Sequence, residues 1–390
     1  MSTRSALTNP KTFCIYPFVQ SVIRTDGGIS ACCLMKSLSS TVDSNIQQAW
    51  HSESWQQLRN DMINGKDVIS ECWSCAEQEE KFGTSMRTQA LRDYKFFAPK
   101  HHDQLLEHYN VKDLSFPNRL EIHVGNLCNL KCMTCRPEDS SALLSENKIL
   151  KIDNLNQQDY AISDSVLDEL YLAIQQRQIK ILDLRGGESL LMPRILQFLK
   201  KLDSTARDEI QLRIQTNCTV LDHEWKALLP QFKQVEIMAS IDSVGKYNTY
   251  IRYPSVWESI ETNVTWFRSQ PNIKLYVNCT VSNLNLLSLP RLIEWCKQVD
   301  VFCHFQILMW PNIFKYNNLP KNILAQAQQQ LIPYQDIAPN INAIVHSHPL
   351  DDCILWSEFC NTVDTRDQYR KNRIFDLYPD LQLHWFKQVD

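Results

Sequence analysis

Strand-like and helix-like segments alternate along residues 118–311, and this alternation restricts the fold more than any other feature. The strand-like segments are rich in apolar and β-branched residues, and they lie at 118–126, 179–187, 210–219, 235–243, 273–282 and 301–310. Continuous apolar strands are typical of a parallel sheet covered on both faces, and the helical patterns between them supply that cover. We therefore predict an α/β fold over residues 116–311, with the sheet open or curled into a partial, TIM-like (β/α)6 barrel.

Residues with distinctive chemistry follow these strand-like segments directly. A cysteine-rich loop that begins at Cys128 follows the first segment, and a Gly-Gly-Glu triplet at 186–188 follows the second. Asn217 lies at the end of the third segment and Ser240 near the end of the fourth. In folds of this class the functional site is built at the carboxyl ends of the parallel strands. The sequence therefore predicts one site at that edge of the sheet.

The segments on either side of the predicted barrel have different patterns. Residues 1–105 lack the alternation and contain five cysteines, which predicts a small cysteine-rich domain organised by metal. Residues 312–390 show helical patterns punctuated by prolines. They predict a mostly helical C-terminal extension.

Charge and hydropathy argue against two classes of protein. The net charge is −4, with no basic stripe of the kind that nucleic-acid binders carry. No apolar run approaches the roughly 18 residues that suggest a membrane span. The sequence also starts without the apolar segment of a secretion signal, so we expect a cytoplasmic protein. In that reducing compartment its fourteen cysteines indicate metal or redox chemistry rather than disulfides.

Cys128, Cys132 and Cys135 stand in the sequence CNLKCMTC, with the spacing C-x3-C-x2-C. Three thiolates this close can bind one metal centre from a single loop, and soft thiolates suit iron–sulfur clusters or zinc. A zinc site would need a fourth ligand, and residues 136–147 contain no cysteine or histidine. We therefore favour a [4Fe–4S] cluster with one iron left open to bind a small molecule. Zinc or inert cysteines are the alternative.

The cysteine loop resembles the SAM-cleaving loop of radical S-adenosylmethionine (SAM) enzymes, and the resemblance extends over roughly residues 118–310. It implies a [4Fe–4S] cluster whose open iron chelates SAM. It also implies that one electron, from a reductant such as flavodoxin or ferredoxin, cleaves SAM to methionine and a 5′-deoxyadenosyl radical. That radical then abstracts hydrogen from a substrate.

Further positions resemble the SAM-binding residues of that family. The resemblance implies that Gly186, Gly187 and Glu188 form the Gly-Gly-Glu turn that holds the SAM amino group. It places Asn217 near the ribose and Ser240 in contact with SAM from the fourth strand. It pairs Arg252 with the SAM carboxylate. Two positions depart from the family pattern. Thr134 stands where an aromatic residue often stacks on adenine, and Ser189 stands where a proline usually follows the turn.

A second set of cysteines lies in the N-terminal segment: Cys14, Cys32, Cys33, Cys72 and Cys75. The spacing from Gly27 to Cys32 resembles the glycine-hairpin-cysteine element of SPASM and twitch domains, which hold auxiliary iron–sulfur clusters in radical SAM enzymes. The resemblance implies a second, auxiliary [4Fe–4S] cluster in this chain.

Four of these cysteines would close such a cluster, and we assign them to Cys14, Cys32, Cys72 and Cys75. Neighbouring residues on a strand point in opposite directions, so only one of Cys32 and Cys33 is expected to bind. The spacing favours Cys32. Structural zinc is the alternative, because C-x2-C with two further cysteines is also a zinc pattern.

Other cysteines of the predicted barrel are assigned to the core, since free cysteine is among the most often buried residue types. They are Cys218, Cys279, Cys296 and Cys303. His123 and His304 are candidates for the barrel interior, where they could contact a substrate.

Three functions remain open. We favour a radical SAM enzyme that modifies a peptide or protein, because SPASM and twitch domains are frequent in peptide modifiers. A radical dehydrogenase or epimerase of a small, carbohydrate-like molecule is the second. A non-catalytic, metal-stabilised binding protein is the third, and the intact cysteine loop, the triplet at 186–188 and Arg252 count against it.

Overall fold

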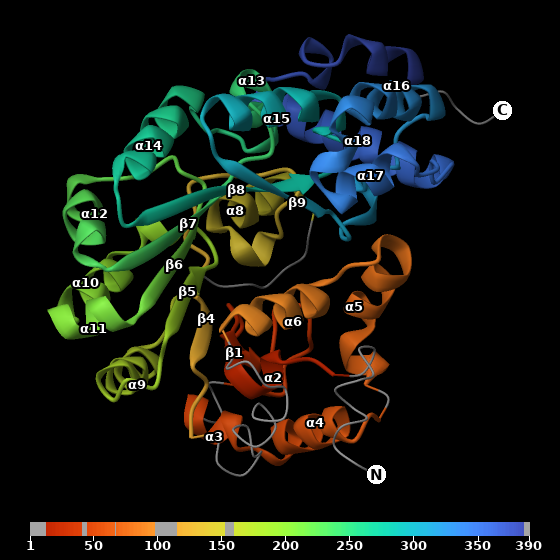
Figure 1. Cartoon of the computed structure of the whole chain (residues 1–390). Coiled ribbons are helices and arrows are strands. Elements are labelled where there is room, and N and C mark those ends of the chain that lie inside the picture. The colour runs from red at the N-terminus through yellow and green to blue at the C-terminus, as the bar shows by residue number, and fades with distance from the viewer. Residues whose placement is uncertain (1–12, 41–44, 67, 98–114, 153–159, 386–390) are drawn as a thin grey trace. The chain divides into compact units, whose positions relative to one another are not determined.

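The computed structural model describes residues 13–40, 45–66, 68–97, 115–152 and 160–385 of the 390-residue chain (Figure 1). The chain divides into two compact units. The first unit combines Met1–Asn126, Tyr160–Ile214 and Ala227–Val235, and the second combines Leu127–Asp159, Gln215–Lys226 and Glu236–Asp390. None of the described helices is long and apolar enough to cross a membrane.

The sheet of the first unit contains both the N-terminal cysteine-rich segment and the start of the predicted barrel. Its strands are β1 (Gln20–Ile23), β2 (Gly28–Ser30), β3 (Ser39–Ser40), β4 (Arg119–His123), β5 (Ile181–Arg185) and β6 (Gln211–Thr216). Their order is β3-β2-β1-β4-β5-β6. β1, β4, β5 and β6 are parallel neighbours, whereas β2 and β3 continue the sheet antiparallel. The N-terminal hairpin therefore extends the parallel sheet, and every residue of β1 is buried.

Helices cover the strands of the first unit because their apolar residues fall on one face. Figure 1 shows α9 (Asp164–Gln175), α10 (Pro193–Lys201) and α11 (Ser204–Glu209) along one side of β4, β5 and β6. α10 begins with proline at its first position, and it buries Ile195, Leu196, Phe198 and Leu199. The Ser163 side chain accepts a hydrogen bond from the backbone N–H of Val166 and so caps α9.

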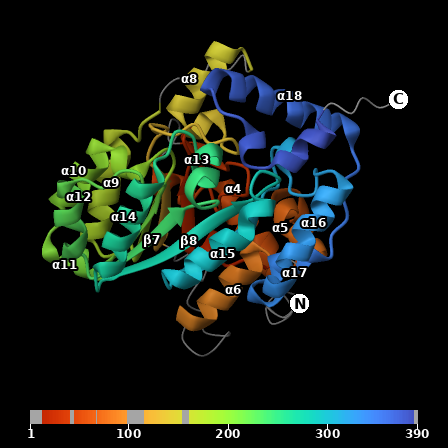
Figure 2. The same cartoon turned by 90° about the horizontal axis from the view of Figure 1, so that it is seen from above.

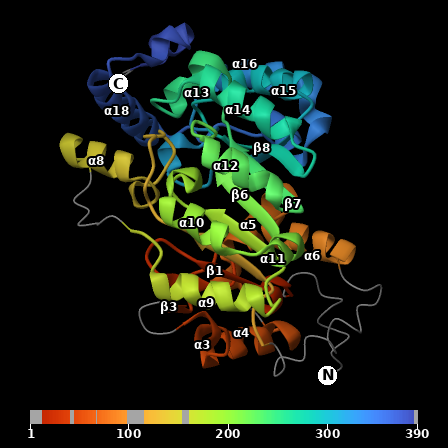
Figure 3. The ribbon, with the colours of Figure 1, turned by 90° about the vertical axis from the view of Figure 1, so that its left-hand side faces the viewer.

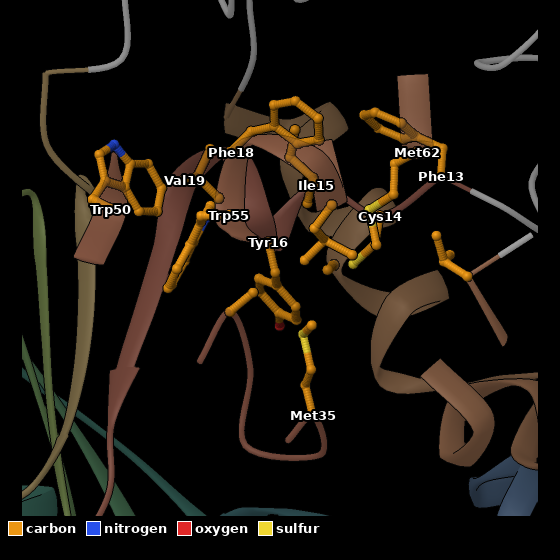
Figure 4. Close-up of a cluster of buried hydrophobic side chains, with 14 of the residues drawn as sticks. Phe13, Cys14, Ile15, Tyr16, Phe18, Val19, Met35, Trp50, Trp55 and Met62 are labelled. Atoms are coloured by element: carbon orange, nitrogen blue, oxygen red, sulfur yellow. The ribbon is translucent and has the colours of Figure 1, made fainter. Parts of the chain in front are cut away.

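The N-terminal segment has an apolar core of its own, shown in Figure 4. Its helices are α2 (Tyr16–Val19), α3 (Ile46–Trp50), α4 (Glu53–Ile63), α5 (Ile69–Phe82) and α6 (Met86–Phe97). The Arg59 guanidinium lies in this core, 4.0 Å from the ring centroid of Trp50, and its Nε donates to the carbonyl of Pro17 at 2.8 Å. Burial lowers the pKa of Arg59 to about 9.

Two hydrogen bonds connect this N-terminal segment to the βα repeats within the first unit. The backbone N–H groups of Ile46 and Gln47 each donate to the Glu169 carboxylate at 2.9 Å. These donors start α3, and Glu169 belongs to α9, which lies near α3 in Figure 3. The carboxylate therefore satisfies N–H groups that a helix start leaves without partners.

The second unit contains the last strands and the C-terminal helices. Its elements are η1 (Pro137–Asp139), α8 (Ser141–Leu150), β7 (Gln234–Ser240), α13 (Gly245–Ile251), α14 (Trp257–Ser269), β8 (Ile273–Val281), α15 (Leu289–Gln298), β9 (Phe302–Ile307), α16 (Lys321–Leu331), α17 (Pro339–Val345) and α18 (Cys353–Arg370). β8 and β9 pair parallel from Tyr276↔Phe302 to Val281↔Ile307. Figure 2 shows α8 beside α18.

The predicted α/β fold class is confirmed, with strands at each predicted position, a cysteine-rich N-terminal segment and a helical C-terminal extension. The domain boundaries at residues 105, 116 and 311 stay a prediction, and the ends of the 1–105 segment lie outside the described residues. The predicted core cysteines Cys218, Cys279 and Cys296 are buried, whereas Cys303 is only partly buried.

Candidate functional site

The predicted cysteine loop lies in the second unit, where backbone hydrogen bonds fix it on both sides. The N–H of Lys131 donates to the carbonyl of Tyr253 at 2.6 Å, and the N–H of Met133 donates to the carbonyl of Ile251 at 2.8 Å. On the other side the Ser140 hydroxyl donates to the carbonyl of Leu130 at 2.7 Å. The loop thus pairs with the chain just after α13 and with the start of α8.

The three thiols of this loop lie within electrostatic range of one another. Burial raises the pKa of Cys135 well above its usual value, and the neighbouring thiols of Cys132 and Cys128 raise it further. Burial also raises the pKa of Cys132, and the Arg252 guanidinium opposes that effect. Thiols this close together are a donor set that an electropositive metal centre would stabilise as thiolates.

Across the described residues, no group of three or more His, Cys, Asp or Glu side chains has a metal-binding arrangement. The donor set nevertheless fits an iron–sulfur cluster, because it offers three soft thiols on one loop with guanidinium groups beside them.

Arg252 is held at this loop by a buried carboxylate. Its Nε lies 2.8 Å from Oδ2 of Asp242, and its Nη1 donates to the Sγ of Cys132 at 3.9 Å. Burial alone would lower the pKa of Arg252, but Asp242 and Cys132 raise it above its ordinary value. The backbone N–H of Thr280 donates to Asp242 Oδ1 at 2.8 Å. The structure therefore brings Arg252 to the cysteine loop as a fixed cation.

Sequence reasoning missed Asp242, although it stands two residues after Ser240 at the end of a predicted strand. Side chains two apart on a strand share one face, and that spacing could have indicated it. Ser240 itself is buried, and its hydroxyl accepts from the side-chain amide of Gln215 at 3.3 Å.

Asn217 contacts the cysteine loop directly. Its side-chain amide donates to Oδ1 of Asn129, between the first two cysteines, at 3.0 Å. Asn129 in turn donates to the Thr219 hydroxyl at 2.9 Å, and that hydroxyl donates to Asn217 Oδ1 at 2.6 Å. This closed ring of hydrogen bonds joins the loop to the chain after β6. It is a positioning contact that the sequence did not predict.

The Gly-Gly-Glu turn lies in the first unit. Both glycines have positive φ, 80° for Gly186 and 50° for Gly187. A Cβ at Gly186 would lie 3.0 Å from the carbonyl oxygen of Gly125 and 3.0 Å from the Cβ of His123, so this position requires glycine. The buried Glu188 carboxylate accepts from the backbone N–H of Leu190 at 3.2 Å.

A buried group of charged residues lies on β4 and β5 in the same unit. The Arg185 Nε lies 3.1 Å from Asp183 and 3.5 Å from Glu121. Arg119 lies 3.1 Å from Asp183, and the His123 ring lies 3.4 Å from Glu121. Burial would raise the pKa of Asp183, but Arg185 and Arg119 lower it below its usual range, so it is ionised. Of these residues the sequence indicated only His123.

Four N-terminal thiols come together from three segments of the first unit. Burial raises the pKa of Cys14 to about 12, with contributions from Cys72 and Cys75. Burial likewise raises the pKa of Cys32, and the neighbouring thiols of Cys33, Cys14 and Cys75 raise it further. Cys72 interrupts α5 with φ −115° and ψ 16°, which turns its side chain out of the regular helical path.

Cys33 has different neighbours. Its thiol has a pKa of about 12, raised by burial and by Glu121, while Arg185 lowers it. Its Sγ also lies 3.9 Å from the sulfur of Met86. The Cys32 thiol thus interacts with Cys33, Cys14 and Cys75, whereas charged residues of β4 and β5 act on the Cys33 thiol.

The N-terminal segment matches a known domain family. Residues 14–76 match the model described as SPASM, an iron–sulfur cluster-binding domain. This match agrees with the predicted likeness of the segment to SPASM-type domains, which bind iron–sulfur clusters. No curated protein shows significant similarity to the chain.

Several solved structures resemble the chain at low identity. Native anSMEcpe with bound AdoMet is 18% identical, with a TM-score of 0.42 over 55% of this chain and 59% of that one. Streptococcus suis SuiB bound to S-adenosylmethionine is 15% identical, with a TM-score of 0.40 over 67% and 57%. The radical S-adenosylmethionine methyltransferase TsrM from Kitasatospora setae is 15% identical, with a TM-score of 0.35 over 47% and 33%. The chain thus spans less than two thirds of the length of these structures.

Proposed function

We propose that this chain is a radical SAM enzyme in which Cys128, Cys132 and Cys135 hold a [4Fe–4S] cluster with one open iron. The observation that carries this proposal is one short loop that holds three thiols close together, with the fixed Arg252 guanidinium beside Cys132. When bound, such a cluster supplies the electron that breaks the S–C5′ bond of SAM, so that the adenosyl fragment can abstract hydrogen from a substrate.

The side chains around the loop would bind and orient SAM. Asp242 holds Arg252 through Nε, which fixes the plane of the guanidinium next to Cys132. A fixed guanidinium binds carboxylates through charge-assisted hydrogen bonds, so we assign Arg252 to the SAM carboxylate. Ser240 and Asn217, at the ends of β7 and β6, are assigned to contacts with SAM and its ribose.

The Gly-Gly-Glu turn supplies the remaining contact. The positive φ angles of Gly186 and Gly187 form a tight turn, and at Gly186 a side chain would clash with Gly125 and His123. Together with Glu188 they are assigned to the SAM amino group, as the family resemblance implies.

The auxiliary cluster is assigned to Cys14, Cys32, Cys72 and Cys75. Cys14 interacts with Cys72 and Cys75, and Cys32 interacts with Cys14 and Cys75. Cys33 also acts on Cys32, but its own thiol lies among the charged groups of β4 and β5. A cluster with four protein ligands has no open iron for SAM. Its role is therefore to relay an electron or to support the substrate region.

We propose a peptide or protein as the substrate, because residues 14–76 match a SPASM domain and the family resemblance implies that such domains are frequent in peptide modifiers. We also propose a cytoplasmic location, because fourteen cysteines indicate a reducing compartment. A flavodoxin or ferredoxin is proposed as the reductant, as the family resemblance implies.

The test separates the two cysteine sets by SAM cleavage in anaerobically reconstituted protein with dithionite. Cys132→Ala should abolish 5′-deoxyadenosine formation, because an open cluster can no longer assemble on the loop. A Cys72→Ala, Cys75→Ala double variant that stays folded should keep SAM cleavage. Cys353→Ala, which removes an exposed cysteine of the second unit, is the control and should match the wild type.

Two results would overturn this proposal. A cluster-loaded wild type that forms no 5′-deoxyadenosine would favour the non-catalytic binding protein. A folded double variant that keeps the loop cluster but cleaves no SAM would place the auxiliary cluster in the electron path to SAM.

A further inference from the structure

The last turn of α18 reaches the cysteine loop through Arg370. Its Nη2 donates to the carbonyl of Lys131 at 2.6 Å, and its Nη1 donates to the sulfur of Met133 at 3.1 Å. These two residues flank Cys132 on either side. The Arg370 side chain is 1% exposed, so it is part of the interior of the second unit.

A buried carboxylate on α8 fixes this arginine. Glu146 is fully buried, and its carboxylate lies 2.7 Å from Nη2 of Arg370 and 3.2 Å from Nη1 of Arg366. Arg366 and Arg370 are four residues apart and share one face of α18. Lys131 places its Nζ 3.6 Å from the same carboxylate. Three cations therefore surround one anion, which leaves a net positive charge beside Cys132.

The same helix also contacts the segment that carries Arg252. The Tyr250 hydroxyl donates to the Asp367 carboxylate at 2.8 Å, and the Arg370 guanidinium lies 5.0 Å from the ring centroid of Tyr253. The carbonyl of Tyr253 is the acceptor for Lys131 of the loop. α18 thus connects the cysteine loop and the Arg252 segment at one point.

We propose that α18 completes the cluster site, with Arg370 as a positioning residue that holds the Cys132 loop and raises the reduction potential of the cluster bound there. This inference rests on the proposed function. The bond to Lys131 fixes the backbone before Cys132, and the net positive charge favours the reduced, more negative form of the cluster. Net charge and hydrogen bonding near the sulfurs are the features by which proteins adjust such potentials.

The experiment is an anaerobic redox titration followed by electron paramagnetic resonance, with iron content measured in parallel. Arg370→Ala should lower the equilibrium constant for reduction of the loop cluster about tenfold. This corresponds to a reduction potential about 59 mV lower for a one-electron couple. The auxiliary cluster in the same molecule should keep its potential and serves as the internal reference. Lys371→Ala, the exposed basic residue that follows α18, is the matched control and should behave as the wild type.

Two further variants separate position from charge. Arg370→Lys keeps the charge but cannot reach Lys131, Met133 and Glu146 together, so its potential should recover while its spectrum still differs from the wild type. Arg366→Ala removes a cation that bonds Glu146 and Asn147 of α8, and its shift should be smaller than that of Arg370→Ala.

The outcomes distinguish this inference from the function on which it rests. If Arg370→Ala and Arg370→Lys match Lys371→Ala in potential, spectrum and iron content, α18 has no such role. If Arg370→Ala loses both clusters through misfolding, the lysine variant decides by its spectrum. If even the wild type assembles no cluster on the loop, the proposed function fails instead.

Discussion

The two cysteine sites are built in opposite ways. In the N-terminal site the thiols come from three separate segments, with Cys14 ahead of α2, Cys32 after β2, and Cys72 and Cys75 on α5. In the loop site all three thiols come from one stretch, residues 128–135. The first site therefore exists only when the N-terminal segment is folded, whereas the second set of thiols is close together in any conformation of the chain.

Their surroundings differ as well. Cys14 lies in an apolar cluster with Phe13 and Ile15, visible in Figure 4. Cys132 lies beside the guanidinium groups of Arg252 and Arg370, both of which lower its pKa. Cations stabilise anionic sulfur, and apolar surroundings oppose it. Both sites have an arginine nearby, since Arg87 lowers the pKa of Cys14, Cys72 and Cys75. They differ because the N-terminal thiols are drawn from separate segments beside an apolar cluster, whereas two guanidinium groups act on Cys132 of the loop.

The largest expected effect comes from the neighbouring pair Cys32 and Cys33. Cys32→Ala should remove the auxiliary cluster and reduce the iron content from about eight to about four per chain, the content of one cubane. Cys33→Ala should leave about eight, because the charged groups of Glu121 and Arg185 lie next to its thiol. Iron and sulfide analysis after anaerobic reconstitution provides the measurement.

The reverse result, with iron lost only in Cys33→Ala, would move the ligand by one residue and contradict the assignment. Loss of a metal site can unfold a small domain. Circular dichroism and gel filtration should therefore accompany both variants, and the serine variants at the same positions provide a matched pair with little change in volume.

A smaller effect is expected at the loop site from Arg252. Arg252→Ala should weaken SAM binding about 10- to 100-fold, since a charge-assisted hydrogen bond contributes about 1.5–3 kcal/mol. Arg252→Lys should recover part of this loss, because it keeps the charge but not the planar fork. Asp242→Asn should have a smaller effect, since it removes only the ion pair that fixes the guanidinium.

Calorimetry with the cluster-loaded protein measures these affinities. Arg268→Ala is the control, because that arginine is paired with the exposed Asp300 on the surface of the second unit. Unchanged SAM affinity in Arg252→Ala would remove this residue from the binding site.

Much of the fold could be predicted, because parallel strands and amphipathic helices have periodicities that appear in the sequence. The placement of Arg252 near the cysteine loop followed from a family resemblance, and the structure agrees with it in geometry. The partners of these residues could not be predicted. Glu146 and Arg370 are separated by more than 200 positions. The spacing from Ser240 could indicate Asp242, but not that its partner is Arg252. Long-range pairing of charges leaves no periodic pattern.

The extension of the sheet by β1 was also beyond prediction. The strand has only four residues, Gln20–Ile23, and two of them are polar. Its parallel pairing with β4 crosses a long stretch of chain, and it needs the helices of the N-terminal segment for cover. Whether a short segment of mixed polarity forms a strand depends on tertiary contacts rather than on its own sequence.

The smallest expected effect is a pH dependence of the unfolding free energy that arises from Asp367 of α18. Burial raises the pKa of Asp367 from 3.8 to about 6, while bonds from the Ile374 N–H and the Tyr250 hydroxyl oppose this shift. The folded protein therefore binds the proton more tightly than the unfolded chain. The stability from this proton is fully present below pH 3.8 and is lost as the pH rises through about 6.

Replacing the carboxyl by an amide should remove this dependence, because Asp367→Asn cannot ionise. Between pH 5 and pH 8 the wild type should lose about 1 kcal/mol of unfolding free energy relative to the variant, since each unit of pKa shift corresponds to about 1.4 kcal/mol. Anaerobic thermal unfolding at both pH values measures the difference, with Asp380→Asn, an exposed carboxyl near the C-terminus, as control. The comparison between variants cancels the other carboxyls, among them Asp183, whose lowered pKa acts in the opposite direction. Parallel pH curves for wild type and Asp367→Asn would show that α18 is not coupled to this proton.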